Sequence, residues 1–80
     1  MFIKDLYNVI SDNVRYYRIN NLKYGYVTQE KLSRLSKVSI SLIRNIEAKN
    51  KSNVINLVAL NNIANALDIP VYKFLIKNNS

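Results

Sequence analysis

The chain has 80 residues, of which 49% are apolar, and its 12 lysines and arginines against 5 acidic residues give a net charge of +7. This length suits one domain, expected over residues 1–80, and leaves no room for a core together with a large catalytic cavity. Cysteine and histidine are absent, which excludes disulfides, thiolate metal sites and the commonest general base. We therefore expect a protein that is not an enzyme and that needs no metal or cofactor.

Hydropathy gives no sign of a membrane or a secretory route. No apolar run approaches the ~20 residues that a membrane span needs. The first residues, MFIKDLYNVISDN, lack a continuous apolar signal core. We therefore expect a cytoplasmic protein with no membrane partner.

The excess positive charge lies in the middle of the chain. Residues 13–56 hold nine lysines and arginines but only two acidic residues, so this segment accounts for the whole net charge. A basic balance often means no more than a soluble surface. Its concentration in one segment favours a polyanionic partner instead.

Helical periodicity begins near the N-terminus. Apolar side chains recur at gaps of three and four residues and predict a helix over residues 3–21. The segment NNLKYGYV, residues 20–27, contains the only glycine and is predicted to be a loop. The apolar stripe of the helix consists of Ile3, Leu6, Ile10, Val14 and Tyr17.

A second, short helix is predicted after this loop. Thr28 stands where an N-cap is expected, because its hydroxyl can accept a hydrogen bond from the first free amides. Leu32 and Leu35 are expected on the buried side of this helix.

A third helix follows after a break at Lys37 and Val38. Ser39 is a second N-cap candidate, and the helix that it starts ends near Ala48. Two short helices joined by a tight turn with one apolar residue have the spacing of a helix-turn-helix. The inward-facing residues of the third helix are expected to be Ile43 and Ile46.

Two more helices are predicted in the C-terminal part. After the polar, basic segment KNKSN, Asn56 is an N-cap candidate for a fourth helix, and Pro70 fits the first turn of a fifth. The pattern therefore predicts an all-α, compact five-helix domain with a central helix-turn-helix. The expected inward residues are Leu57, Leu60, Ile63, Ala64 and Leu67 in the fourth helix and Val71, Phe74 and Leu75 in the fifth.

These motifs resemble the phage-repressor and Cro type of helix-turn-helix protein, the Xre family. The resemblance covers roughly residues 13–76 and rests on TQEKLSRLSKVSISLIRNIE and LVALNNIANALDIP. It implies a lambda-repressor-like fold and a transcriptional regulator that binds double-stranded operator DNA, usually as a two-fold dimer. Lys37 stands where the family usually has glycine, so it must adopt a positive φ or shift the turn. The loops at 20–27 and 48–56 are longer than is usual in the family.

The resemblance implies a set of DNA-contacting residues. It places a recognition helix at about residues 39–48 in the major groove, which is about one helix wide. Gln29 is expected to contact a phosphate from the start of the second helix, where free amides also favour an anion. The expected DNA-contacting residues are Thr28, Gln29, Ser39, Ile40, Ser41, Arg44, Asn45, Lys49 and Lys51.

Several of these side chains also have simpler interpretations. Arg44 can fork onto a guanine edge and Asn45 onto an adenine edge, while Ile40 can meet a thymine methyl group. Ile40 can instead be a core residue, although the base contact is favoured, and Ser39 can be an N-cap, a base contact or both. The first-turn glutamine can be an ordinary helix residue, and the two lysines can belong to a solvated loop.

Two further assignments concern structure and assembly. The resemblance implies that Arg18 pairs with Glu47 and thereby holds the recognition helix in place. The last helix is more apolar than one short terminal helix needs, which suggests a dimer face formed by Val71, Tyr72, Phe74, Leu75 and Ile76. A stripe of Phe2, Ile3 and Leu6 competes for that role.

We therefore expect a sequence-specific DNA-binding regulator, most simply a homodimeric repressor at operator sites. An antitoxin or a restriction-modification controller of the same fold is an alternative, and an antirepressor or a toxin is a further partner to consider. A protein-interaction module that has lost DNA binding belongs to another class. The outward-facing Arg44 and Asn45 and the clustered charge argue against that class.

Overall fold

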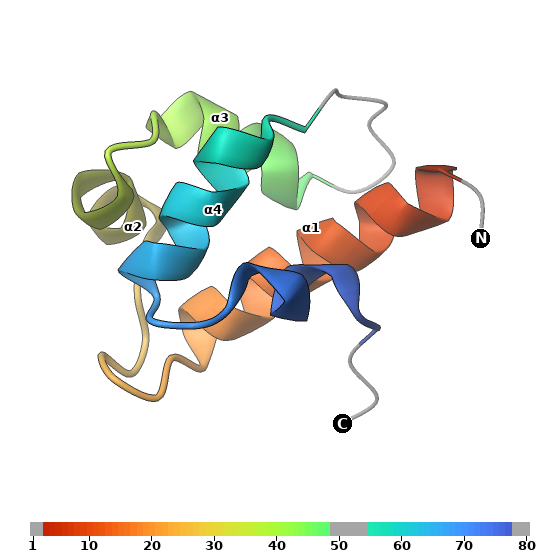
Figure 1. Cartoon of the computed structure of the whole chain (residues 1–80). Helices are drawn as coiled ribbons and strands as arrows, with labels where there is room; N and C mark the ends of the chain where they lie inside the picture. Colours follow the sequence, from red (N-terminus) through yellow and green to blue (C-terminus); the bar gives the residue numbers. More distant parts are fainter. Residues whose placement is uncertain (1–2, 49–54, 78–80) are drawn as a thin grey trace.

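The computed structural model describes residues 3–48 and 55–77 (Figure 1). Among these residues, no helix is long and apolar enough to cross a bilayer. The regular elements are all helical, which confirms the predicted all-α class with a central helix-turn-helix. In chain order they are α1 (Ile3–Ile19), α2 (Gln29–Ser36), α3 (Ile40–Glu47), α4 (Leu57–Ala66) and the 3-10 helix η1 (Val71–Leu75).

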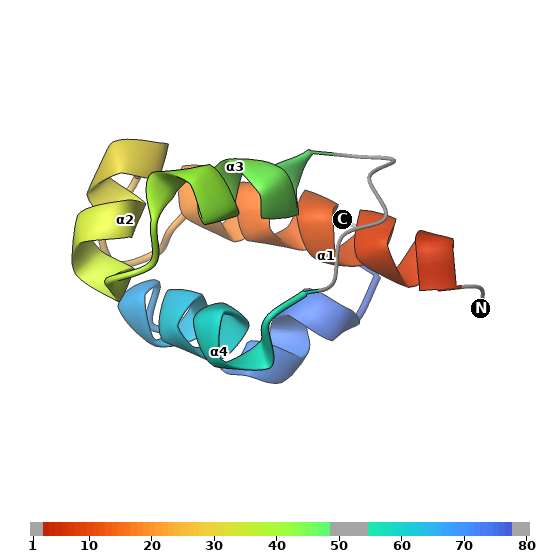
Figure 2. The ribbon, with the colours of Figure 1, turned by 90° about the horizontal axis from the view of Figure 1, so that it is seen from above.

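The helices form two layers that α2 joins at one end. Seen from above, α3 runs beside α1, while α4 and η1 lie together on the other side (Figure 2). α2 packs on both α3 and α4, and η1 packs on α1 and α4. The helix-turn-helix, α2 and α3, therefore rests on α1 and α4.

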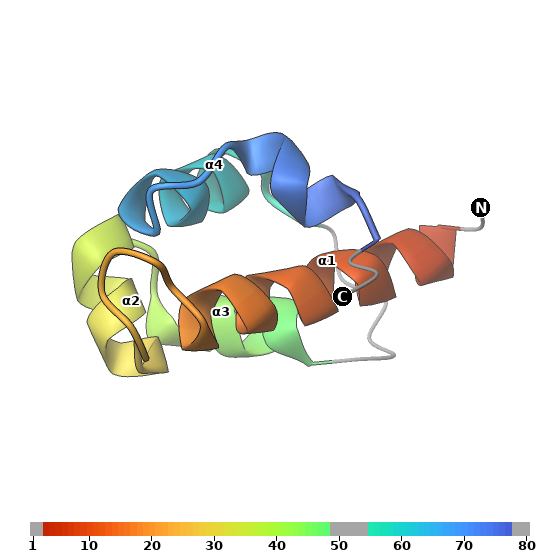
Figure 3. The ribbon, with the colours of Figure 1, turned by 90° about the horizontal axis from the view of Figure 1, so that it is seen from below.

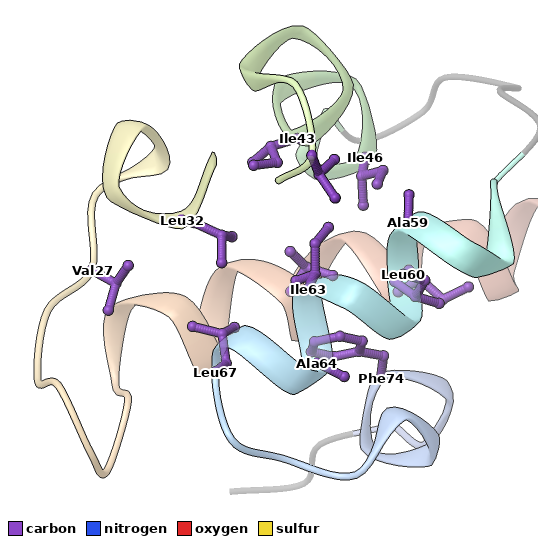
Figure 4. Packing of buried hydrophobic residues seen from close by; sticks show 13 residues of the cluster. Val27, Leu32, Ile43, Ile46, Ala59, Leu60, Ile63, Ala64, Leu67 and Phe74 are labelled. Atoms are coloured by element: carbon purple, nitrogen blue, oxygen red, sulfur yellow. The ribbon is translucent and has the colours of Figure 1, made fainter. Parts of the chain in front are cut away.

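The core fills the space between these layers. Side chains from α2, α3, α4 and η1 point toward one another there (Figure 4). Phe74 is completely buried and closes the end of the core near η1. The other fully or almost fully buried residues include Val14, Val27, Leu32, Ile43, Leu60, Ile63, Ala64 and Leu67.

Each predicted N-cap makes the expected hydrogen bonds. The Thr28 hydroxyl accepts from the N–H of Lys31 at 3.0 Å, and the Ser39 hydroxyl accepts from the N–H of Leu42 at 3.2 Å. The Asn56 side chain accepts from two amides of the first turn of α4. Short polar residues therefore determine where α2, α3 and α4 begin.

The buried side of α2 differs from the prediction. Leu32 is buried as expected, but Leu35 is 39% exposed and Ser36 takes the inward position. A serine can be buried there because its hydroxyl is satisfied: it donates to the Leu32 carbonyl at 2.7 Å and accepts from the Val38 N–H at 3.2 Å.

The first turn of α4 also differs. Leu57 is 73% exposed, so its predicted inward position is wrong. The buried side of α4 starts instead at Ala59 and Leu60 and continues through Leu67. Periodicity identifies the buried face of a helix, but it does not tell how far the neighbouring helices extend along that face.

The predicted fifth α-helix is a five-residue 3-10 helix, so the fold has four α-helices in the described residues. Pro70 precedes it, and the Asn13 side chain binds the carbonyls at its end, donating to Phe74 at 2.9 Å and Ile76 at 2.7 Å. These carbonyls are therefore satisfied without a continuing α-helical ladder. Leu75, predicted as an anchor, is largely exposed.

Candidate nucleic-acid interface

The turn between α2 and α3 has a left-handed residue at its start. Lys37 has φ 63° and ψ 20°, and its N–H donates to the Ser33 carbonyl at 3.0 Å. The lysine thus adopts the positive φ that glycine would adopt at lower cost, and the turn keeps its geometry. The Ser33 hydroxyl donates to the Val38 carbonyl at 2.6 Å, which ties α2 to the turn. Val38 itself is buried.

Arg18 of α1 and Glu47 of α3 form a buried, bidentate ion pair. Arg18 Nε lies 2.7 Å from Glu47 Oε2 and Nη2 lies 2.8 Å from Oε1, with side chains only 6% and 4% exposed. The hydrogen bonds to Glu47 raise the pKa of Arg18, although burial acts in the opposite direction. Arg18 Nη1 also donates to the Val27 carbonyl at 2.8 Å. One side chain therefore connects α1, the end of the loop before α2, and the end of α3.

Gln29 joins the same network. Its Nε2 donates to Glu47 Oε1 at 3.2 Å, so the first residue of α2 is linked to the last residue of α3. Its side chain is partly buried. This contact orients the side-chain amide of Gln29, while the Lys31 N–H of the same turn donates to the Thr28 hydroxyl.

The outer face of α3 is polar and accessible. The exposed residues on this face are Ser39, Ser41, Arg44 and Asn45. Ile40 is partly buried, which is intermediate between the exposed position of a base contact and the buried position of a core residue. The Arg44 guanidinium lies 3.9 Å from the Glu30 carboxylate, and both side chains are more than half exposed. An arginine, an asparagine and a serine thus face outward from one helix of eight residues, and the exposed Ser39 caps its start.

The remaining predicted site residues are placed as follows. Thr28 is exposed at the start of α2. Lys49 and Lys51 lie outside the described residues. Of the predicted dimer face, Val71 packs partly on the core and Phe74 is fully buried, so Phe74 is not available to a partner. Tyr72, Leu75 and Ile76 are exposed.

Three buried polar residues that support α3, η1 and the end of α4 were not predicted. The Ser11 hydroxyl donates to the Ile46 carbonyl and thereby fastens the C-terminal end of α3 to α1. Asn13 holds η1, and Asn21 donates to the Leu67 carbonyl at 2.7 Å. A signal was present for the first two, since they lie between Ile10 and Val14 on a helix whose buried face had been identified.

Solved structures that are similar to this chain include the following two. A hypothetical transcription factor, NHTF from Neisseria, matches with a TM-score of 0.75 and 27% sequence identity over 92% of this chain and 78% of its own. The restriction-modification controller protein C.AhdI from Aeromonas hydrophila matches with a TM-score of 0.70 and 24% identity over 85% of this chain and 94% of its own. No protein-family model and no curated protein matches the sequence. The chain therefore has the helix-turn-helix fold that these two proteins share.

Proposed function

We propose that this protein is a sequence-specific DNA-binding transcriptional regulator of the phage-repressor and Cro type, with α3 as its recognition helix. The observation that carries the proposal is the exposed row of Ser41, Arg44 and Asn45 on a short helix that a buried ion pair holds in place. A major groove admits one such helix, and arginine and asparagine form bidentate contacts with guanine and adenine.

The supporting contacts have separate roles in this proposal. The first turn of α2, with Thr28 and Gln29, meets the phosphate backbone, because the positive end of the helix dipole favours an anion there. The network of Arg18, Gln29 and Glu47 keeps α2 and α3 at a constant angle when they meet the duplex. Backbone contacts position the protein, while base contacts from α3 supply sequence discrimination.

Similarity to a hypothetical transcription factor and to a restriction-modification controller supports a regulatory role. We propose repression at an operator near the gene as the simplest form. A controller of a restriction-modification system is a second form of the same activity, favoured by the match to C.AhdI over 94% of that chain.

The test is a binding titration with a labelled duplex from the region upstream of the gene and a scrambled duplex of equal length. We expect tighter binding to the upstream duplex by about 10³-fold or more. Log affinity should fall linearly with log salt, with a slope near −0.9 for each neutralised phosphate. Equal, salt-independent binding to both duplexes, or none, would favour the protein-interaction module instead.

A further inference from the structure

The loop between α1 and α2 is held in a defined shape by one buried side chain. Asn21 Oδ1 accepts from the N–H groups of Lys23 at 3.0 Å and Tyr24 at 2.8 Å, and its Nδ2 donates to the Leu67 carbonyl. Asn21 and Gly25 also exchange backbone hydrogen bonds of 3.1 and 2.9 Å. Gly25 has φ +72°, a conformation that suits glycine at this tight reversal. The loop is therefore fastened to the end of α4.

This ordered loop holds a leucine fully in water. The side chain of Leu22 is completely exposed and borders two neighbouring hollows between the loop and the segment after α4. The first hollow, of about 130 Å³, is also lined by Tyr16, Tyr17 and Ile69. A single exposed leucine needs no explanation, but an exposed leucine beside an apolar hollow is a surface that can receive another apolar side chain.

Positive charge is gathered beside this leucine. The ammonium groups of Lys23 and Lys31 lie 5.4 and 5.1 Å from the centroid of the Tyr24 ring, within the range of a cation–π contact. In the described part of the chain, no carboxylate pairs with either lysine. The second hollow is lined by Lys23 and also by one acidic residue, Asp68.

The position of this surface separates it from the recognition helix. The loop lies at the lower side of the molecule in Figure 1, whereas α3 lies at the top. Seen from below, the loop is in front and α3 is behind α1 (Figure 3). A molecule bound at the loop would therefore leave the outer face of α3 free.

We propose that the loop surface, formed by residues 21–25 and 67–69, is a docking site for a different protein that presents an apolar side chain flanked by acidic residues. The apolar side chain would fill the hollow beside Leu22, and the acidic residues would face Lys23 and Lys31. A second copy of this chain fits less well, because its net charge of +7 opposes its approach to a basic surface. This inference does not rest on the proposed DNA-binding function.

The probe is a short synthetic peptide that alternates leucine and phenylalanine with aspartate and glutamate. It would be titrated into the isotopically labelled full chain, with amide chemical shifts as the readout. We expect saturable shifts confined to residues 21–25 and 67–69. Peptides with serine in place of the apolar residues, or lysine in place of the acidic ones, should bind about tenfold more weakly or worse.

Variants assign the binding to this surface. Leu22→Ser and Lys23→Glu should each weaken the peptide by about tenfold, since they remove an apolar contact and reverse a charge. Leu57→Ser is the matched control, because this leucine is also exposed but lies on α4, and it should bind the peptide unchanged.

Four results would overturn the proposal. The first two are the absence of saturable shifts and shifts that map to α3. The third is that Leu22→Ser and Leu57→Ser weaken peptide binding equally. The fourth is that shifts depend on protein concentration without peptide, which would indicate a second copy. The proposal would also be overturned if duplex DNA shifted the same loop amides and if Leu22→Ser left those shifts unchanged. That result would assign the lysines to nucleic acid.

Discussion

Glu30 of α2 holds its carboxylate 3.9 Å from the guanidinium of Arg44 on α3, across the open side of the helix-turn-helix. Both side chains are largely exposed, so the pair contributes little to the stability of the fold. It does keep one acidic group beside the side chain that is proposed to read a base. Arg44 must leave this carboxylate, or share it, to reach a guanine.

Glu30→Gln should therefore tighten DNA binding. Removal of the carboxylate takes away a repulsive charge near the backbone and a competitor for Arg44, so we expect both operator and scrambled duplexes to bind more tightly. The unfolding free energy should change by less than about 0.5 kcal/mol, as for most exposed ion pairs. Fluorescence titration and urea denaturation measure the two effects. Weaker operator binding by Glu30→Gln would show that the carboxylate orients Arg44 productively.

Arg44→Ala should reduce discrimination more than general affinity. We expect a loss of about 1–3 kcal/mol per half-site on the operator, with relaxed preference at one base pair. Lys23→Ala is the control, since it removes the same charge from the loop on the side away from α3 and should leave both duplexes unaffected. If Arg44→Ala weakens operator and scrambled duplex equally, α3 does not read bases through this residue.

Glu47→Ala should destabilise the fold. The substitution leaves the Arg18 guanidinium buried without its partner, which costs roughly 3–5 kcal/mol for a fully buried pair. Because pairing raises the pKa of Arg18, the stabilisation that comes from its charged form is fully present at neutral pH and is lost as pH rises through that raised pKa.

Urea denaturation of Glu47→Ala, Arg18→Ala and the double variant measures this coupling. The two single losses should add to more than the loss of the double variant, because the residues share one interaction. Glu30→Ala serves as the control for removal of an exposed acid. A Glu47→Ala variant that unfolds like the original chain but no longer binds DNA would contradict the structural role and favour direct contact.

Lys37→Gly should stabilise the protein by up to about 1 kcal/mol. The lysine has a positive φ, which costs roughly 1–2 kcal/mol for a residue with a Cβ. Glycine removes this cost, but part of the gain is offset because glycine has more conformational entropy to lose on folding. Lys37→Ala removes the same charge but retains the Cβ, so it should show no such gain. The urea midpoints of the three proteins distinguish these outcomes. A glycine variant that is less stable than the original chain would contradict the claim that the positive φ of Lys37 costs stability.

We further propose that the protein acts as the homodimer expected from its sequence, with two recognition helices about one DNA turn apart, ~34 Å, over a near-palindromic site. The exposed Tyr72, Leu75 and Ile76 are the part of the predicted dimer face that remains available. Ile76→Asp should therefore shift sedimentation toward the monomer, whereas Leu57→Asp should not. Monomers alone, both free and on the operator, would rule out this assembly.

Local chemistry was predictable from the sequence where one residue determines the result. Thr28 and Ser39 were identified as caps because a short hydroxyl side chain satisfies amides only a few residues away. For Lys37 the resemblance, which places glycine there, left a positive φ or a shifted turn as alternatives, and the structure has the positive φ. The pairing of Arg18 with Glu47 came from the resemblance alone, since charge pattern does not identify partners so far apart in sequence.

Features that depend on the neighbouring helices were not predictable. Leu35 and Ser36 differ in hydropathy, yet the serine faces inward because the Leu32 carbonyl in α2 and the Val38 N–H in the turn satisfy its hydroxyl. The end of η1 is determined by Asn13, which is distant in sequence and lies on another helix. The order of the 20–27 loop depends in the same way on a bond from Asn21 to the end of α4.

The contacts of Arg18 have a consequence for how the molecule opens. This side chain binds the Val27 carbonyl and Glu47, while its own carbonyl accepts from the Val27 N–H at 3.0 Å. A fluctuation that lifts α3 away from α1 must therefore expose a buried guanidinium and also loosen the segment that leads into α2. The amides of α2 and α3 should consequently exchange with solvent deuterium as one cooperative unit, while the outer turns of η1 exchange earlier and independently.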